Sequence, residues 1–587
     1  MSDIKNKILP FAGKDIFLQE FYNLYCQFTK DPTNKDYFIQ EIISLHNDNL
    51  LNIVSEYNKL NNNSNTSRVD FFLCRQIFVD ILPFIKADIK EVLNCVKNLT
   101  LEAGNDLTAN DLITPFEKFC KANNCSEELL AIGLNNIDES FDCITVAIIA
   151  GSELQLEMYT EKAIALCNYE NNIVQKRAIF SLGRINYQSN NLLIDKVFTM
   201  IKTKAINYSE DFYPNILRLI ISLYRQKNNL EEQVIKLCLI LLKNEDAQLI
   251  HVVSKILFQD IKILPRNIYN VLLKTLTKVN PNNTYTLHYI DYILCYLLKN
   301  NLKEDLYVFL EELLIKNNKL SINIFNSFIH ELVNNKKDIL NSLVTRWFLS
   351  RRIVLGRAVA EILKNDIDKN IYLTVDKAQL KNLPEGICLF LSRKAYGWLF
   401  REFISAVTYI VSLIDISTNK ELEGISFLLF NRLLICYPDK IRECFENLLQ
   451  KEISEKTAKV INNLIAQQEL FFKNLNDYEN ISELKPSLSQ RAQYNQYHST
   501  LMNNAYKKAN KKSLISQLVT QKTILYGNCS IFYRYNNLDG TNKTREIVPF
   551  YHYSHSIAYP SLAFLDPHNL DFELSTFKVE GCYETNN

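Results

Sequence analysis

The stretch Val174–Ile201 constrains the fold of this chain more than any other segment. Its apolar residues recur at helical spacing in two runs, which are separated by Asn190 and Asn191. Because asparagine is a common turn residue, the stretch predicts two short amphipathic helices joined by a polar turn. Such a pair cannot bury its apolar faces alone, so it needs a similar pair on each side.

Similar apolar helices recur through residues 116–480, at irregular steps of about 31 to 41 residues. They centre near Ala147–Gly151, Ala178–Gly183, Leu219–Leu223, Val253–Leu257, Ile293–Leu297, Phe328–Leu332 and Ala358–Leu363. Prolines fall between the helical patterns, where helix boundaries are expected. The chain has 587 residues, too many for a single hydrophobic core. An array of repeats can reach this length because each repeat packs only on its neighbours.

The run from Arg177 to Arg184, which reads Arg-Ala-Ile-Phe-Ser-Leu-Gly-Arg, resembles the first helix of a HEAT repeat. The resemblance covers this unit well and the other units loosely. It implies an α-solenoid, a fold that commonly serves as a scaffold or a binding surface.

The predicted fold is mainly α, an irregular HEAT-like α-solenoid with a small mixed α/β module that contains a β-hairpin. Residues 1–115 are expected to form an N-terminal helical cap, 116–480 the solenoid, and 481–587 a basic helix plus the C-terminal module. Alternation in residues 531–535, Asp539-Gly540 as a hairpin turn and a return strand at Glu546–Ser554 support this module. Phe572–Val579 is predicted to be a last short strand.

Composition limits the possible chemistry. Only 12 residues are glycine, and the chain has no GxGxxG, P-loop, HExxH or GxSxG motif. The 14 cysteines are scattered without a CxxC pair, which favours free thiols in a reducing cytoplasm. With a net charge of +1, no signal-like N-terminus and no apolar run near the ~20 residues that span a bilayer, we expect a cytoplasmic protein without a membrane partner.

A basic group with both tryptophans lies in the predicted solenoid. It comprises Arg346, Trp347, Arg351, Arg352, Arg357, Arg393, Lys394, Trp398 and Arg401. The step from Arg352 to Arg393 is close to one repeat, so these residues could form a stripe along one groove. Arginine beside tryptophan is common at interfaces. In the alternative interpretation, the tryptophans lie in the core and the arginines pair with neighbouring acids.

A second basic group lies in residues 491–538, which contain no acid. Lys507, Lys508, Lys511 and Lys512 share one helical face, and Arg534 follows in the predicted strand, with tyrosines interleaved. A polyanion would relieve the repulsion between these lysines, and aromatic rings offer stacking platforms. The alternative is a solvated lysine face.

Histidines gather late in the chain, where His552 and His555 are followed by Asp566 and His568. In a strand, the odd spacing of His552 and His555 puts their rings on opposite faces, so one metal ion could bind both only at a bulge. Exposed sheet histidines are the alternative, and we expect no metal and no cofactor.

The sequence therefore predicts a non-catalytic scaffold or adaptor that binds a protein partner along a solenoid groove. One alternative is a nucleic-acid-binding helical-repeat protein that uses the basic groove and the lysine cluster. A second is a metal-dependent enzyme whose site lies in the C-terminal module.

Overall fold

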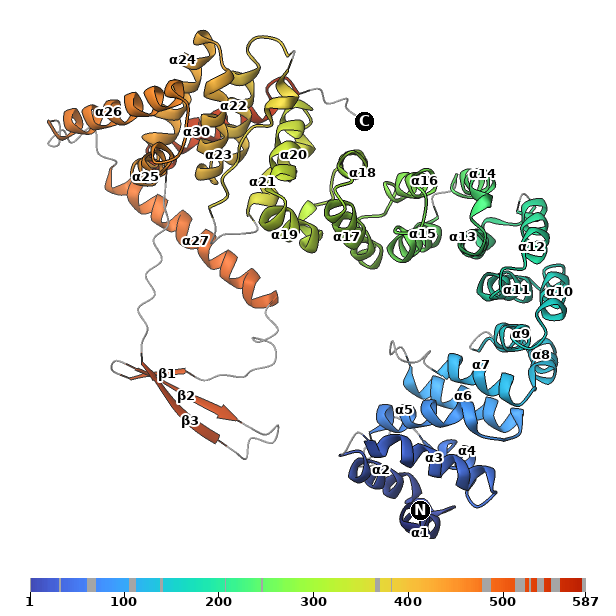
Figure 1. Cartoon of the computed structure of the whole chain (residues 1–587). Coiled ribbons are helices and arrows are strands. Elements are labelled where there is room, and N and C mark those ends of the chain that lie inside the picture. Colours follow the sequence, from blue (N-terminus) through green and yellow to red (C-terminus); the bar gives the residue numbers. More distant parts are fainter. Residues whose placement is uncertain are drawn as a thin grey trace. The chain divides into compact units, whose positions relative to one another are not determined.

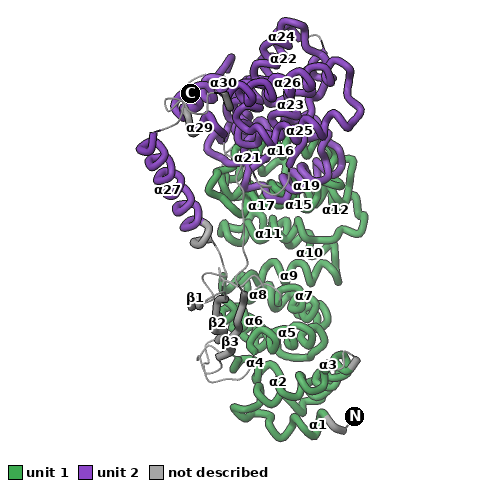
Figure 2. Tube along the Cα trace, turned by 90° about the vertical axis from the view of Figure 1, so that its left-hand side faces the viewer, with its two compact units in different colours: residues 1–293 green, residues 294–587 purple. Residues whose placement is uncertain are grey.

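The computed structural model describes residues 2–30, 33–60, 70–104, 112–137, 141–205, 207–243, 246–364, 370–381, 383–477, 487–512, 523–526, 529–535, 543–549 and 560–582. The chain divides into two compact units, residues 1–293 (unit 1) and 294–587 (unit 2), coloured separately in Figure 2. Helices dominate both units, which confirms the mainly α class. The predicted boundaries after residues 115 and 480 stay predictions. Within the described ranges, no helix combines the length and apolar character needed to cross a membrane.

The helices of unit 1 follow one another along the chain. They are α1 (Ser2–Ile8), α2 (Phe17–Phe28), α3 (Thr33–Asn47), α4 (Ile53–Tyr57), α5 (Phe71–Ile81), α6 (Ile89–Ala103), α7 (Ile113–Ala122), α8 (Ser126–Asn135), α9 (Cys143–Ser152), α10 (Leu156–Leu166), α11 (Asn172–Arg184), α12 (Asn191–Lys204), α13 (Tyr213–Gln226), α14 (Glu231–Leu241), α15 (Ala247–Asp260), α16 (Arg266–Leu276) and the first part of α17 (Thr284–Lys299). In the described ranges, 3₁₀ turns lie between them at η1 (Leu9–Phe11), η2 (Leu82–Phe84), η4 (Glu210–Phe212) and η5 (Asn228–Leu230).

From α7 onward, unit 1 is built of helical hairpins in two layers (Figure 1). The odd-numbered helices pack on one another in chain order, α7 on α9, α9 on α11, α11 on α13 and α13 on α15. The even-numbered helices lie beside them, with α10 on α12 and α14 on α16. We call these the odd layer and the even layer. The predicted pair of helices around Asn190 is present as α11 and α12, and the Asn190 side chain caps α12 by accepting from the Leu193 N–H.

Contacts between neighbouring hairpins recur at a nearly constant separation. In the even layer, Lys162 binds Glu127 and Lys196 binds Glu161, each 35 residues apart. In the odd layer, Ser181 donates to Thr145, 36 residues away. Equivalent positions of successive hairpins therefore stack, as a helical-repeat array requires.

Unit 2 continues with the rest of α17 and a further series of helices. These are α18 (Lys303–Lys316), α19 (Asn326–Asn335), α20 (Lys337–Leu349), α21 (Ile353–Lys364), α22 (Ile387–Leu399), α23 (Phe403–Leu413), α24 (Asn419–Phe427), the π-helical segment η9 (Leu428–Leu434), α25 (Pro438–Leu449), α26 (Glu455–Asp477), α27 (Leu488–Lys512), α29 (Ser561–Leu565) and α30 (Pro567–Val579), with 3₁₀ turns η6 (Ile322–Ile324), η7 (Lys377–Leu380) and η8 (Ile414–Ile416). α19 packs on α20, α20 on α21, α21 on α22, and α22 on α23.

After α27, the described residues include the short strands β1 (Thr523–Tyr526), β2 (Cys529–Tyr535) and β3 (Lys543–Pro549). They pair in the antiparallel order β1-β2-β3, with Ile531 opposite Ile547. The predicted turn residues Asp539 and Gly540 lie outside the described residues. A folded C-terminal module built on these strands stays a prediction.

The predicted strand Phe572–Val579 is wrong, because these residues belong to helix α30. The Asp566 side chain accepts from the Asn569 N–H, and Pro567 occupies the first turn. An aspartate followed by proline is a helix-start signal, since the carboxylate satisfies a free N–H and proline lacks one. The Asp566-Pro567 pair therefore begins a helix.

Candidate partner-binding surfaces

The predicted residues around Trp347 serve the packing of unit 2. The Trp347 side chain is only 1% exposed, so its ring packs in the core and does not face a partner. Arg346 makes two hydrogen bonds to Glu311, from Nε to Oε1 at 2.6 Å and from Nη2 to Oε2 at 3.1 Å. Both residues follow the alternative interpretation, a core tryptophan and an arginine paired with an acid on a neighbouring helix.

The other arginines of this group differ in exposure. The Arg351 guanidinium lies over the Phe390 ring, 5.2 Å from its centroid. Arg357 donates to the Asn318 carbonyl and lies 3.7 Å from a Glu361 oxygen. Arg352 and Arg401 are exposed. The structure therefore leaves only part of the predicted stripe open to solvent.

At Arg393 and Lys394, the group meets the chain's own helix α30, which packs on α22 and more lightly on α21 (Figure 1). Arg393 on α22 donates from Nη1 to Glu580 Oε1 at 2.7 Å, and its guanidinium lies 5.7 Å from the centre of the Phe577 ring. The carboxylate that this arginine binds thus comes from the C-cap residue of α30, 187 residues further along the chain.

Lys394 holds the C-terminal end of α30. Its side chain is 2% exposed, and Nζ donates to the Lys578 carbonyl at 2.7 Å and lies 3.3 Å from Cys582 Sγ. The last carbonyls of a helix have no partner within the helix and carry partial negative charge. The buried Lys394 ammonium therefore binds a carbonyl at the C-terminal end of α30.

Glu573 anchors the middle of α30. Its Oε1 accepts from Arg432 Nε at 2.9 Å, and its Oε2 accepts from the Tyr396 hydroxyl at 3.1 Å. Burial, together with the negative charge of Glu573, raises the pKa of Tyr396, so the hydroxyl stays a donor. Arg432 lies in the π-helical segment η9, a helix irregularity of a kind that is frequent at functional sites.

Gly397 lets the backbones of α22 and α30 approach closely. A Cβ atom at this position would lie 3.1 Å from the Lys578 backbone nitrogen and 3.2 Å from the Leu574 carbonyl oxygen. Beside it, the Trp398 indole covers Gly356, and the Lys578 ammonium lies 5.4 Å from the Trp398 ring centre. Gly397 thus leaves room for the α30 backbone, and Gly356 leaves room for the Trp398 ring.

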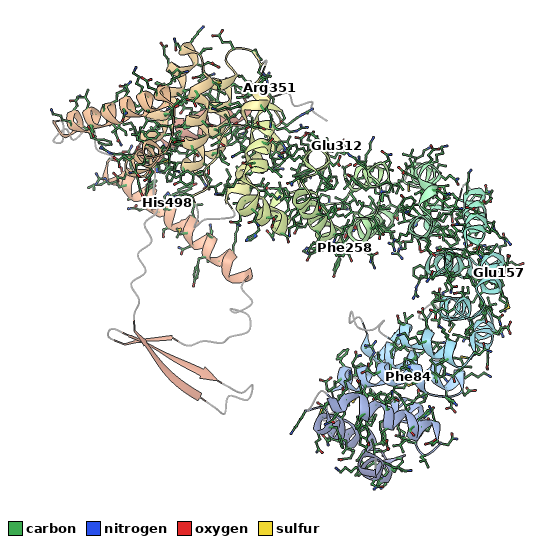
Figure 3. All side chains as sticks on the ribbon, viewed as in Figure 1. Phe84, Glu157, Phe258, Glu312, Arg351 and His498 are labelled. Carbon is green, nitrogen blue, oxygen red and sulfur yellow. The ribbon has the colours of Figure 1, made fainter. Side chains whose placement is uncertain are left out.

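Unit 1 carries a different surface, which our sequence analysis did not predict. On the odd layer, the rings of Phe258, Tyr285 and Tyr292 are 45%, 77% and 55% exposed. Phe258 lies 5.2 Å from the Tyr289 ring and 5.4 Å from the Tyr292 ring, centre to centre. Figure 3 labels Phe258 on this surface. We call it the aromatic surface, and it comprises Phe180, Arg218, His251, Lys255, Phe258, Tyr285, Tyr289 and Tyr292.

The cations of the aromatic surface are not neutralised by the described carboxylates. The Arg218 guanidinium lies 6.0 Å from the Phe180 ring centre, and burial lowers the pKa of Arg218. Lys255 is exposed. His251 Nδ1 lies 3.0 Å from Thr286 Oγ1, and burial followed by the charges of Lys255 and Arg218 lowers the pKa of His251. Within the described part of the chain, neither Arg218 nor Lys255 forms an ion pair.

A sequence signal for this surface exists in α17. Tyr285, Tyr289 and Tyr292 are spaced by four and three residues, so they share one side of the helix. That spacing is also typical of a core stripe, and only exposure separates the two interpretations.

The predicted polyanion group lies partly on α27. Lys507 and Lys508 are exposed, and the neighbouring Tyr497 and Tyr506 rings are also mostly exposed. The side chains of Lys511, Lys512 and Arg534 lie outside the described part.

Of the predicted histidine group, His552 and His555 fall outside the described residues, and Asp566 caps α30 near the exposed His568. No three His, Cys, Asp or Glu side chains gather as metal ligands in the described ranges.

Comparison of the chain with known proteins finds no family model that matches it and no curated protein that matches its sequence. What is shown is thus a series of helices that pack on their neighbours, which is compatible with a helical repeat, and the more specific HEAT assignment stays a proposal.

Proposed function

We propose that this chain is a non-catalytic scaffold or adaptor, a HEAT-like α-solenoid that binds a protein partner through the aromatic surface of unit 1. The observation that supports this most is the exposure of Phe258, Tyr285 and Tyr292 beside Arg218 and Lys255. Tyrosine, phenylalanine and arginine are enriched where proteins meet, and clustered apolar side chains left in water favour association.

The charge of this surface indicates the chemistry of the partner. Two cations without a described carboxylate partner favour a segment that carries acidic residues, and the exposed rings favour apolar side chains next to them. Interfaces with nucleic acid are much more positively charged than this surface, which has two cations and one histidine of lowered pKa. An acidic protein segment therefore fits better than a phosphate backbone.

The proposal is tested by isolating the tagged full chain with its partners from the native cell and quantifying them by mass spectrometry. The double variant Phe258→Ala/Tyr292→Ala should lose the partner, because central aromatic anchors carry most of the binding energy. The matched control is Leu192→Ala/Leu239→Ala, which removes two exposed apolar side chains from the even layer. If both double variants retain the same proteins in the same amounts, the aromatic surface is not the binding site.

A second candidate function, polyanion binding, is supported by α27. Its exposed Lys507 and Lys508 stand beside the exposed Tyr506, which fits stacking on a single-stranded nucleic acid. Here a labelled single-stranded RNA should bind the full chain more weakly as salt rises, and Lys507→Glu/Lys508→Glu should weaken it further. Absence of binding at low salt would remove this candidate.

A further inference from the structure

We propose that the surface of α21, α22 and η9 beneath α30 is a binding site for an acidic amphipathic helix of a partner protein, and that α30 occupies it as an exchangeable internal ligand. This site lies in unit 2 and is independent of the aromatic surface. It adds a second partner chemistry to the function proposed above.

The site recognises general features of a helix. Lys394 binds a carbonyl of the last turn, which any helix presents there. Arg432 binds Glu573 within α30, and Arg393 binds Glu580, the C-cap residue seven positions further on. Seven residues are close to two helical turns, so the two carboxylates reach the site from about the same side of the helix. Gly397 admits the helix backbone. A helix with two carboxylates at this spacing satisfies all three features.

α30 is an imperfect ligand for this site at one position, Lys578. Its ammonium faces the Trp398 ring, and it is subject to the positive charges of Lys364 and Arg401, which Asp571 offsets only in part. Burial and these two cations lower the pKa of Lys578.

The receptor side of this position has a net positive charge. Glu402 is the carboxylate on which Lys364 and Arg401 act, and burial raises the pKa of that carboxyl. With two cations against one acid, this part of the surface carries a net positive charge. A partner helix with a carboxylate in place of Lys578 would be attracted where α30 is repelled.

The docking of α30 is also shallow. Leu570 is the one described apolar side chain of α30 that is buried, whereas Phe572 is 73% exposed and Val579 is exposed as well. Of the two ion pairs that hold the helix, the one between Arg393 and Glu580 remains partly accessible to water, and accessible ion pairs contribute little to stability. These features suit a helix that can leave its site.

The test uses the full chain and fluorescent peptides of residues 560–582, one with the natural sequence and one with Lys578→Glu. We expect the Lys578→Glu peptide to bind roughly fivefold more tightly than the natural peptide, since one repulsive charge becomes attractive. Its binding should also speed hydrogen exchange in the chain's own α30, because the two helices compete.

In the full chain, the substitution Lys578→Glu should change hydrogen exchange in α30 in opposite directions, depending on whether α30 is an exchangeable ligand or Lys578 only stabilises the fold. If α30 is an exchangeable ligand, Lys578→Glu should slow hydrogen exchange in residues 567–579 and weaken binding of the added peptide. If Lys578 only stabilises the fold through Trp398, the exchange becomes faster. Faster exchange, equal affinity of the two peptides, or no peptide binding overturns the proposal.

Two controls isolate the site. A Glu573→Lys peptide should not bind, because it places a cation against Arg432. The chain variant Phe258→Ala/Tyr292→Ala should bind the Lys578→Glu peptide normally, so a failure of this proposal is distinguishable from a failure of the function proposed for unit 1.

Discussion

The two units of this chain use the same ingredients, arginine beside aromatic rings on helices of an array, and reach different outcomes. In unit 2, Arg393 and Arg432 pair with carboxylates of α30, and the Phe577 ring of α30 lies against Arg393. In unit 1, Arg218 lies over Phe180 without a described carboxylate partner, and the rings around Phe258 stay in water. The contrast teaches that a hot-spot pattern identifies a surface suited to binding but not whether the chain already fills it.

The substitution Gly397→Leu and its counterpart in unit 1 should show the largest difference between the two units. The new side chain meets the backbone of α30, so the helix is expelled and unit 2 loses ~2 kcal/mol or more of stability, as overpacking costs. Hydrogen exchange of residues 567–579 and denaturant unfolding measure both effects. Gly183→Leu is the matched variant, because Gly183 crowds Leu219 between two helices of the array. It should destabilise unit 1 and leave exchange in α30 unchanged; protection of α30 in Gly397→Leu would contradict the role given to this glycine.

The second largest difference between the units should come from the stability effects of replacing one phenylalanine in each unit by alanine. Phe577→Ala removes a ring packed on Tyr396 and Arg393 and should cost about 1–2 kcal/mol, because an aromatic contact and a cation–π contact are both lost. Phe258→Ala removes an exposed ring and should change stability by less than ~0.5 kcal/mol while it weakens partner binding. Thermal unfolding of the two variants gives the comparison, and equal losses would mean that Phe258 is structural.

The coupling energies of ion pairs should differ less between the two units than the effects of the phenylalanine truncations. A double-mutant cycle on Arg432 and Glu573 should give a coupling of ~1 kcal/mol, because the pair is largely shielded and the carboxylate also binds Tyr396. The pair Lys196–Glu161 in unit 1 is half exposed, and its coupling should stay below ~0.5 kcal/mol. A larger coupling in unit 1 would show that solvent exposure does not decide the difference.

The smallest expected effect concerns pH. His251 is neutral at pH 7, and its lowered pKa means that the unfolded chain takes up a proton first as the pH falls below about 6.5. The stability of unit 1 should therefore decline below that pH. Affinity for an acidic partner should instead rise over the same range, because a bound carboxylate favours protonated His251. Binding measured from pH 7.5 to 5.5 should show this rise in the natural chain and not in His251→Gln.

Local sequence patterns predicted the array because the information they carry is local. Asn190 between two apolar runs is sufficient to predict the turn between α11 and α12, and the recurrence of such runs predicts stacked hairpins. The HEAT assignment and the division at residues 115 and 480 go further than these patterns and stay predictions.

The candidate sites depended on information that local patterns lack. No spacing indicates that Arg393 meets Glu580, since the two residues are 187 positions apart. Exposure was equally hidden, because Tyr285, Tyr289 and Tyr292 have the spacing of a core stripe. The strand predicted at Phe572–Val579 failed for a local reason, the helix-start signal of Asp566-Pro567, which the sequence already contained.

The bond from Lys394 to the Lys578 carbonyl has a consequence for how the protein is made. During synthesis, Lys394 leaves the ribosome 184 residues before the carbonyl that it will bind. Until then, the Lys394 ammonium on α22 must be solvated by water or bind another acceptor, such as the C-terminal end of a helix in a chaperone. Hairpins of unit 1, whose contacts are only about 35 residues apart, can mature as they emerge. On a translating ribosome, α22 should therefore reach its native contacts only after α30 has been synthesised, although α22 lies far upstream in the sequence.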